Sequence, residues 1–164
     1  MHTPHQKNGS PPASSASPME QALAEARAAA ARGEVPVGAV VVGPDGVVLA
    51  AAGNRTEELA DPSAHAEMLA LRAAATRRGV PRLPECDLVV TLEPCPMCAA
   101  AIGLFRIRRL VFGAYDPKGG GVEHGPRLYA APGAQHRPEV VGGVREREAA
   151  ALLSTFFAAR REDP

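Results

Sequence analysis

The sequence predicts an α/β domain in which a sheet lies between two layers of helices. Apolar stretches of strand length alternate along the chain with longer segments of helical periodicity, which is the pattern of an α/β fold. The first two of these strands are almost continuously apolar, as expected for a sheet that is covered on both faces. The 164 residues are enough for one compact domain with its own core.

We expect a single domain over residues 17–164, preceded by a disordered tail. Residues 1–16 are polar and rich in Pro, Ser and Gly, so they cannot bury enough apolar surface to offset the cost of ordering. No stretch approaches the ~20 apolar residues of a membrane span, and the N-terminal region lacks the apolar core of a secretion signal. Three cysteines are an odd number for a disulfide scaffold and favour a reducing compartment. A cytoplasmic protein is therefore expected.

The first helix is predicted to begin after Ser17. Ser17 and Glu20 have the spacing of a capping box, and Pro18 stands at the first helical position. Small and apolar residues recur at helical spacing as far as Arg32, and Gly33 is a natural stop. This helix contributes to the core, and no residue in it suggests chemistry.

Two antiparallel strands are predicted next, over residues 35–42 and 47–52. Both segments are rich in Val, which favours strands. The sequence Gly-Pro-Asp-Gly at 43–46 separates them and is typical of a turn. The two segments are therefore expected to pair directly.

A second helix is predicted from about residue 61 to residue 78. Asp61 is a suitable N-cap, and Pro62 would stand just inside the helix. The helical pattern continues to about Arg78-Gly79. His65 and Glu67 then lie in or near the first turn of this helix.

The rest of the chain continues the alternation but contains one long irregular region. Residues 114–138 include Gly119-Gly120-Gly121 and several prolines, and a loop of this length in a small domain is usually functional or mobile. The last helix is predicted to bury an apolar face that includes Phe156 and Phe157. The remaining predicted elements are strands at 88–91, 110–113 and 139–141, a helix from Cys95 to about residue 104, and the last helix at 146–161.

His65-Ala66-Glu67 and Pro94-Cys95-Pro96-Met97-Cys98 form the most informative pattern in the chain. Each segment follows a strand and opens a helix, and in open α/β sheets ligands bind at the edge where such helices begin. One imidazole and two thiolates are zinc ligands, and three protein ligands leave a fourth position for water. Glu67 is not needed as a ligand and can transfer the protons of a hydrolytic reaction.

Two other interpretations of these residues remain open. A structural zinc would need a fourth protein ligand, for which His124 and His136 in the long loop are the candidates. A Cys-x-x-Cys pair at a helix start is also typical of thiol–disulfide exchange, which would use Cys95 and Cys98 without zinc. The third thiol, Cys86, is expected to be a small buried hydrophobic residue.

The chain resembles the bacterial tRNA-specific adenosine deaminases, a branch of the cytidine-deaminase-like superfamily. The His-x-Glu and Pro-Cys-x-x-Cys pattern is the signature of zinc nucleobase deaminases and identifies the superfamily. Flanking segments narrow the resemblance to the tRNA branch and extend it over about residues 18–161. These segments are 34–40, Asn54-Arg55, 61–67, 91–99, 111–114, 116–118, His136-Arg137, 154–157 and Arg160-Arg161.

The resemblance implies a three-layer α/β/α, cytidine-deaminase-like domain with a five-stranded mixed sheet and one Zn²⁺ per subunit. It implies that His65, Cys95 and Cys98 bind the zinc, and that Glu67 transfers protons. The substrate-binding residues that it implies are Asn54 at the purine, Ala66 through its backbone, Asp116 near the flipped nucleotide, and Phe156 with the Arg160-Arg161 pair along the RNA.

The activity implied by the resemblance is deamination of adenosine to inosine at the wobble position of a tRNA anticodon loop, by a homodimer. Deamination at a ring carbon requires an unstacked base, and a loop base is cheap to extrude. The formal net charge is zero, but all basic residues except Lys7 and Lys118 are Arg, which suits planar contacts with phosphates and bases. Neither DNA nor a membrane is an expected partner. The alternatives are a deaminase of the same fold that acts on a free base or nucleoside such as guanine or cytosine, and a zinc-stabilised binding module without catalysis.

Overall fold

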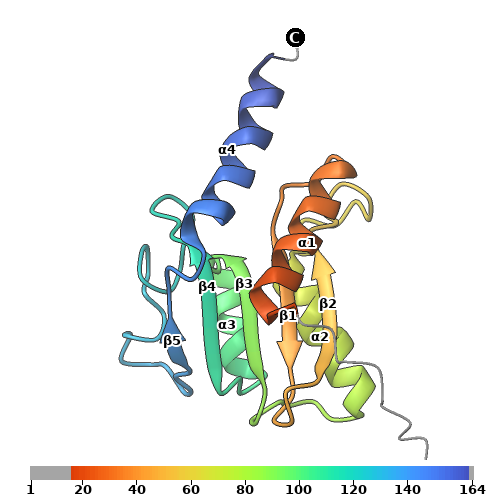
Figure 1. The fold of residues 1–164 in the computed structure, drawn as a ribbon. Helices are drawn as coiled ribbons and strands as arrows, with labels where there is room; N and C mark the ends of the chain where they lie inside the picture. The colour runs from red at the N-terminus through yellow and green to blue at the C-terminus, as the bar shows by residue number, and fades with distance from the viewer. Residues whose placement is uncertain (1–15, 163–164) are drawn as a thin grey trace, which may run out of the picture.

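The computed structural model describes residues 16–162, so the predicted disordered tail lies, except for its last residue, outside the described residues. The described residues form four helices and five strands, which are labelled in Figure 1. Their order is α1 (Pro18–Ala31), β1 (Gly38–Val42), β2 (Val48–Gly53), α2 (Ala66–Arg78), β3 (Asp87–Leu92), α3 (Pro96–Leu104), β4 (Arg109–Ala114), β5 (Glu139–Val141) and α4 (Glu146–Glu162).

The five strands form one mixed sheet with the order β2-β1-β3-β4-β5. Strand β1 runs antiparallel to both of its neighbours, β2 and β3, whereas β3, β4 and β5 are parallel to one another. Since β2 and β3 both oppose β1, they point the same way, and their carboxyl ends lie at the same edge of the sheet. The loops that lead into α2 and α3 therefore begin at one common edge.

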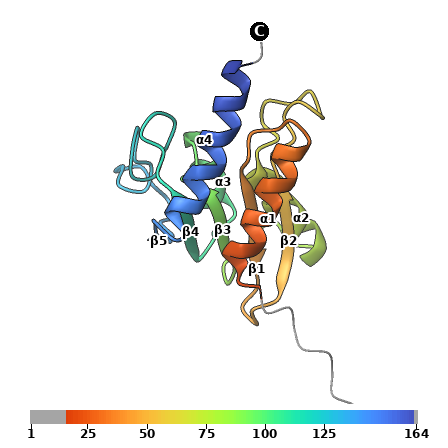
Figure 2. The same ribbon diagram turned by 45° about the horizontal axis from the view of Figure 1, so that its top comes forward.

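The helices cover the sheet on both faces, which confirms the predicted three-layer α/β/α domain. Figures 1 and 2 show α1 and α4 on one face and α2 and α3 on the other. Each face has its own buried cluster, which is larger between the sheet and α2 and α3. All five residues of β1 are buried, as its continuous apolar character predicts. No helix within residues 16–162 combines the length and apolarity needed to span a membrane.

The start of α1 confirms the predicted capping box. The hydroxyl of Ser17 accepts a hydrogen bond from the backbone N–H of Glu20 at 3.1 Å, and the Glu20 carboxylate accepts one from the N–H of Ser17 at 3.3 Å. Strand β1, in contrast, begins at Gly38 and not at residue 35. A Cβ at Gly38 would lie 1.9 Å from the carbonyl oxygen of Ala22, so α1 packs directly on the strand where it begins.

The start of α2 differs from its prediction. The helix begins at Ala66, and its N-cap is His65 and not Asp61. The Asp61 carboxylate accepts hydrogen bonds from the N–H and the hydroxyl of Ser63, at 2.8 and 2.7 Å, and so stabilises a turn ahead of the helix. The predicted end of the helix is confirmed. The last helical residue is Arg78, and the C-cap Gly79 has a φ of 67°, in the left-handed region that favours glycine.

The apolar face predicted for the last helix is buried only at its beginning. Within α4, Ala149 is buried, Phe156 is half-buried and Phe157 is 45% exposed. The physical reason is visible in Figure 1, where the C-terminal half of α4 extends beyond the edge of the sheet and has no layer beneath it.

Candidate metal centre and active site

The three predicted metal ligands come together at the carboxyl edge of the sheet. His65 is the N-cap of α2, Cys95 is the N-cap of α3, and Cys98 lies in the first turn of α3. The Sγ atoms of Cys95 and Cys98 each lie 3.6 Å from Nδ1 of His65. All three donor atoms lie within 4.8 Å of one another.

This spacing fits a single zinc ion. Tetrahedral ligands at the usual zinc distances of ~2.3 Å for sulfur and ~2.05 Å for nitrogen lie about 3.6 Å apart. Both sulfur–nitrogen distances have this value, and the ring nitrogen that faces the sulfurs is Nδ1 of His65. The three residues thus supply three of the four ligands of a tetrahedral site, and the fourth position is left for a water molecule.

The electrostatics favour anionic sulfur at this position. A hydrogen bond from the Cys98 thiol, with further support from His65, lowers the pKa of Cys95 to about 4. Cys95 also stands at the N-terminus of α3, where the helix dipole favours negative charge. A bound divalent ion stabilises both thiolates further, since a coordinating thiol is deprotonated.

Glu67 is the buried carboxylate beside the three ligands. It lies in the first turn of α2 and is 3% exposed, and burial raises its pKa above the usual range of a carboxyl group. Among the described residues, its Oε1 atom is the buried side-chain oxygen or nitrogen that has no hydrogen-bond partner. A buried oxygen without a partner next to a metal site can accept a hydrogen bond from a water molecule there and then take its proton.

Asn54 is fixed in one orientation next to α2. Its Oδ1 accepts a hydrogen bond from the N–H of Ala66 at 2.7 Å, and because the partner is a donor this side-chain atom must be the oxygen. Its backbone is held on both sides, by the carbonyl of Val37 and the guanidinium of Arg32. Within residues 16–162, Nδ2 of Asn54 has no protein acceptor and remains a free donor.

The two loop histidines do not reach the metal ligands. Neither of them is therefore the fourth ligand that a structural zinc would need. Nδ1 of His124 lies 2.8 Å from the carboxylate of Glu93, and Nε2 of His136 lies 2.7 Å from the carbonyl oxygen of Ile107. Neither residue belongs to the cluster of donor atoms around His65. Among the described residues, the site therefore has the three-ligand composition of a catalytic zinc centre.

Two residues that the resemblance places along the RNA, Asp116 and Phe156, make local contacts within the protein. The Asp116 carboxylate accepts hydrogen bonds from the backbone N–H groups of Lys118 and Gly119, at 3.2 and 2.9 Å, and closes its own turn. Phe156 lies on the protruding part of α4, where the guanidinium of Arg160 stacks at 4.5 Å from its ring centroid. Neither contact involves the metal ligands, and the roles of both residues at the RNA stay predictions.

Sequence reasoning assigned no role to two carboxylates, Glu34 and Glu93, that are both 1% exposed. Glu34 accepts hydrogen bonds from the backbone N–H groups of Glu57 and Glu58, at 3.3 and 2.8 Å, in the loop that follows Asn54. Glu93 binds the loop that follows β4. The signal in the sequence is a single carboxylate directly beside an apolar segment. A carboxylate that is buried with such a segment needs hydrogen-bond donors nearby.

Comparisons with known proteins agree with this site. A family model described as the cytidine and deoxycytidylate deaminase zinc-binding region matches residues 13–114. The tRNA-specific adenosine deaminase of Agrobacterium fabrum is 55% identical over 145 residues, which are 88% of this chain and 95% of the relative. A solved structure from studies of A-to-I editing by tRNA:A34 deaminases is 56% identical, with a TM-score of 0.81 over 83% of this chain and 98% of that one. A guanine deaminase from Nitrosomonas europaea is 27% identical, with a TM-score of 0.71 over 86% and 83% of the two chains.

Proposed function

The chain belongs to the cytidine and deoxycytidylate deaminase zinc-binding family, and on that premise we propose that it deaminates adenosine to inosine at the wobble position of a tRNA anticodon loop. Residues 17–164 form its single deaminase domain. His65, Cys95 and Cys98 hold one Zn²⁺ per subunit, and the tetrahedral spacing of their donor atoms supports this assignment.

Glu67 moves the protons of the reaction. When bound, the zinc ion lowers the pKa of a water molecule to roughly 7 and so supplies a nucleophile at neutral pH. The unpartnered oxygen of Glu67 takes the proton from that water and delivers it to the ring nitrogen next to the attacked carbon. The carboxylate then takes a second proton, from the hydroxyl group that has been added to the attacked carbon, and passes it to the amine. The amine leaves as ammonia while that carbon forms the carbonyl group of inosine, so one residue serves both halves of the reaction.

Asn54 and Ala66 hold the purine in place. The hydrogen bond from Ala66 fixes the amide of Asn54, so its Nδ2 is a preoriented donor for a purine acceptor. A fixed donor costs less ordering entropy on binding than a mobile one. The rigid backbone around Ala66, at the first residue of α2, forms the adjacent contact surface.

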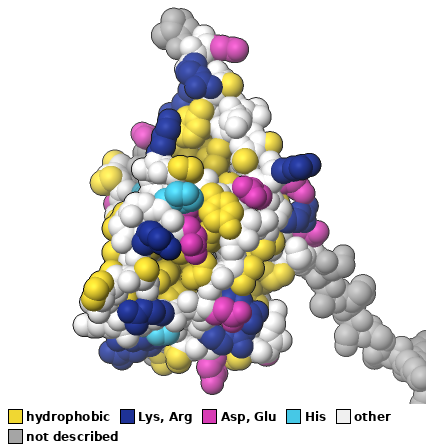
Figure 3. Space-filling view, turned by 90° about the vertical axis from the view of Figure 1, so that its left-hand side faces the viewer, with side chains coloured by type: hydrophobic (Ala, Val, Ile, Leu, Met, Phe, Trp, Pro, Cys, Tyr) yellow, Lys and Arg dark blue, Asp and Glu magenta, His cyan; other side chains and the backbone are white. Residues whose placement is uncertain are grey.

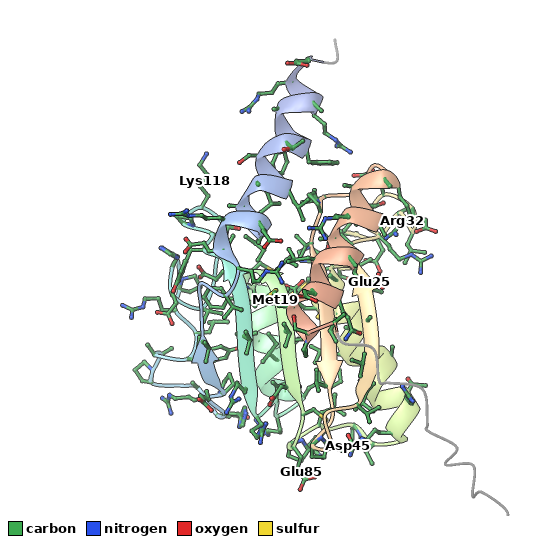
Figure 4. All side chains as sticks on the ribbon, in the orientation of Figure 1. Met19, Glu25, Arg32, Asp45, Glu85 and Lys118 are labelled. Carbon is green, nitrogen blue, oxygen red and sulfur yellow. The ribbon has the colours of Figure 1, made fainter. Side chains whose placement is uncertain are left out.

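The sequence identity is the observation that supports the substrate class. The chain is 55% identical to a tRNA-specific adenosine deaminase over almost its full length, whereas its identity to the guanine deaminase is 27%. Basic side chains near the site are available for contacts with RNA phosphates. Figure 3 shows positive side chains on the protruding helix α4 and on the body below it. Figure 4 shows Lys118 and Arg32 near the edge that carries the site. Nε of Arg32 lies 4.0 Å from the carboxylate of Glu58. We propose a cytoplasmic enzyme, since tRNA is its substrate.

The substrate assignment is tested with an anticodon stem-loop that carries adenosine at the wobble position. We expect stoichiometric inosine in the stem-loop and no ammonia from free guanine, cytosine or adenosine, measured by nucleoside chromatography. Activity on a free base without activity on the stem-loop would instead support the free-base alternative. Tight binding of the stem-loop by zinc-loaded protein without any product would support a binding module.

We also propose that the enzyme is a homodimer that forms through the outer side of α3. Leu104 is 69% exposed and Met97 is 38% exposed, which is unusual for large apolar side chains on one short helix. Leu104 borders an apolar hollow of about 510 Å³, together with Gly103, Tyr129 and His136. A second copy that covers this hollow would bury Leu104.

Replacing Leu104 by Asp is expected to convert the dimer into a monomer. A charge at the centre of an apolar interface is costly, and we expect the dissociation constant to rise roughly 100-fold or more. Sedimentation equilibrium of the wild type and the variant measures this directly. The matched control is Val80→Asp, which places the same charge at another exposed apolar residue, 44% exposed, after α2. A monomeric wild type, or a Leu104→Asp dimer as tight as the wild type, contradicts the proposal.

A further inference from the structure

The carboxylate of Glu93 is the centre of a set of hydrogen bonds from the loop that follows β4. Its Oε1 accepts from the N–H of Asp116 at 3.1 Å and from Nδ1 of His124 at 2.8 Å. Its Oε2 accepts from the N–H groups of Val122, Glu123 and His124, at 3.3, 3.0 and 3.1 Å. Five donors from residues 116–124 therefore converge on one side chain.

The same loop lies directly on the segment that carries a metal ligand. The N–H of Gly121 donates to the carbonyl oxygen of Pro94 at 2.8 Å. A Cβ at Gly121 would lie 2.7 Å from Cα of Pro96, and a Cβ at Gly120 would lie 2.3 Å from Oε2 of Glu93. The two glycines thus permit the close approach of the loop, which brings residues 116–124 against the start of α3.

Glu93 is suited to this role because its side chain is enclosed and both of its oxygens face donors from the loop. It is 1% exposed, so the loop provides the donors that its buried oxygens need. An ionised carboxylate accepts at both oxygens and donates nothing. A glutamine at this position would turn an N–H₂ group toward at least two of the five donors.

We propose that Glu93 is a positioning residue that holds loop 116–124 as a fixed wall beside the zinc site and so sets the affinity for the RNA substrate. The inference rests on the proposed function, because it concerns how that substrate is bound. Glu93 does not belong to the cluster of metal ligands. Its effect passes through the loop, whose backbone it anchors on one side while Pro94 anchors it on the other.

The test compares Glu93→Gln with the wild type in two measurements. Loss of hydrogen bonds to a charged group corresponds to roughly tenfold or more in an equilibrium constant. We therefore expect KM for the anticodon stem-loop to rise about tenfold while kcat changes less than about threefold, with one zinc per chain retained. We also expect amide hydrogen exchange in 116–124 to accelerate about tenfold. The amides of Glu57 and Glu58, held by Glu34, provide an internal control that should not change.

Two further variants separate positioning from general destabilisation. His124→Ala removes one of the five donors and leaves the four backbone groups, so its effect on KM should be clearly smaller than that of Glu93→Gln. Val40→Ala creates a small cavity in the core beneath α1 and should lower the melting temperature without changing KM.

Three results would overturn the proposal. They are unchanged loop exchange in Glu93→Gln, a KM change equal to that of Val40→Ala, and loss of zinc from Glu93→Gln. A wild type that leaves the stem-loop unmodified refutes the proposed function alone, because the exchange measurement does not depend on turnover.

Discussion

Replacing Glu67 by Gln is expected to abolish deamination while zinc remains bound. The variant keeps the shape of the side chain, and no metal ligand is removed, since the ligand atoms belong to His65, Cys95 and Cys98. It loses the group that takes a proton from water and gives it to the ring nitrogen and the amine. General acid–base catalysis by one residue contributes roughly 10²- to 10⁴-fold, and Glu67 acts more than once, so kcat should fall by at least that factor.

Single-turnover kinetics on the anticodon stem-loop, together with elemental analysis of zinc, measure both parts of this prediction. Glu20→Gln is the matched control: it is the same substitution in the capping box of α1, where glutamine also serves, and it should leave kcat unchanged. If Glu67→Gln loses its zinc, the residue is a ligand and its assigned role is wrong. A variant that retains more than about a tenth of the wild-type kcat contradicts proton transfer by Glu67.

The local signals in the sequence were sufficient for most of the fold. Ser17 and Glu20 act within one turn of α1, and Gly79 acts within one turn of α2, so their effects are visible in a short window of sequence. The start of α2 was not predictable in this way. It depends on the hydrogen bond from Ala66 to Asn54, which joins residues 12 positions apart in different elements, while the expected N-cap Asp61 is used by Ser63.

The metal ligands were predictable because their spacing along the chain reflects the chemistry of one ion. The residues that support the site were not predictable, because their partners lie far away along the chain. Glu93 and His124 are separated by 31 positions and meet only because β3 and β4 are neighbours. The exposure of Phe157 was also beyond local reasoning, since a helical apolar face does not reveal where the sheet beneath it ends. Such features depend on how the chain is arranged in space.

The replacement of Cys95 by Ala is expected to remove both zinc and activity. A site with two protein ligands binds zinc far more weakly than one with three, and the lost ligand is the thiolate whose pKa is about 4. Alanine is otherwise harmless at this position, because the Cys95 side chain makes no capping hydrogen bond to α3. Zinc should fall from one equivalent to nearly none after dialysis against a weak chelator, measured by elemental analysis, with deamination lost in parallel.

The same loss should appear in stability, because an ion that binds only the folded state stabilises it by about 4 kcal/mol at roughly 1,000 times its dissociation constant. Cys86→Ala is the matched control: it removes a thiol that is 1% exposed and lies outside the ligand cluster, so it should keep its zinc and its activity. Equal zinc in Cys95→Ala and the wild type would exclude Cys95 as a ligand.

A wild type isolated with a Cys95–Cys98 disulfide and no zinc would instead favour thiol–disulfide exchange. In that case, treatment with a chelator should leave the melting temperature unchanged, whereas a zinc enzyme should lose stability under the same treatment.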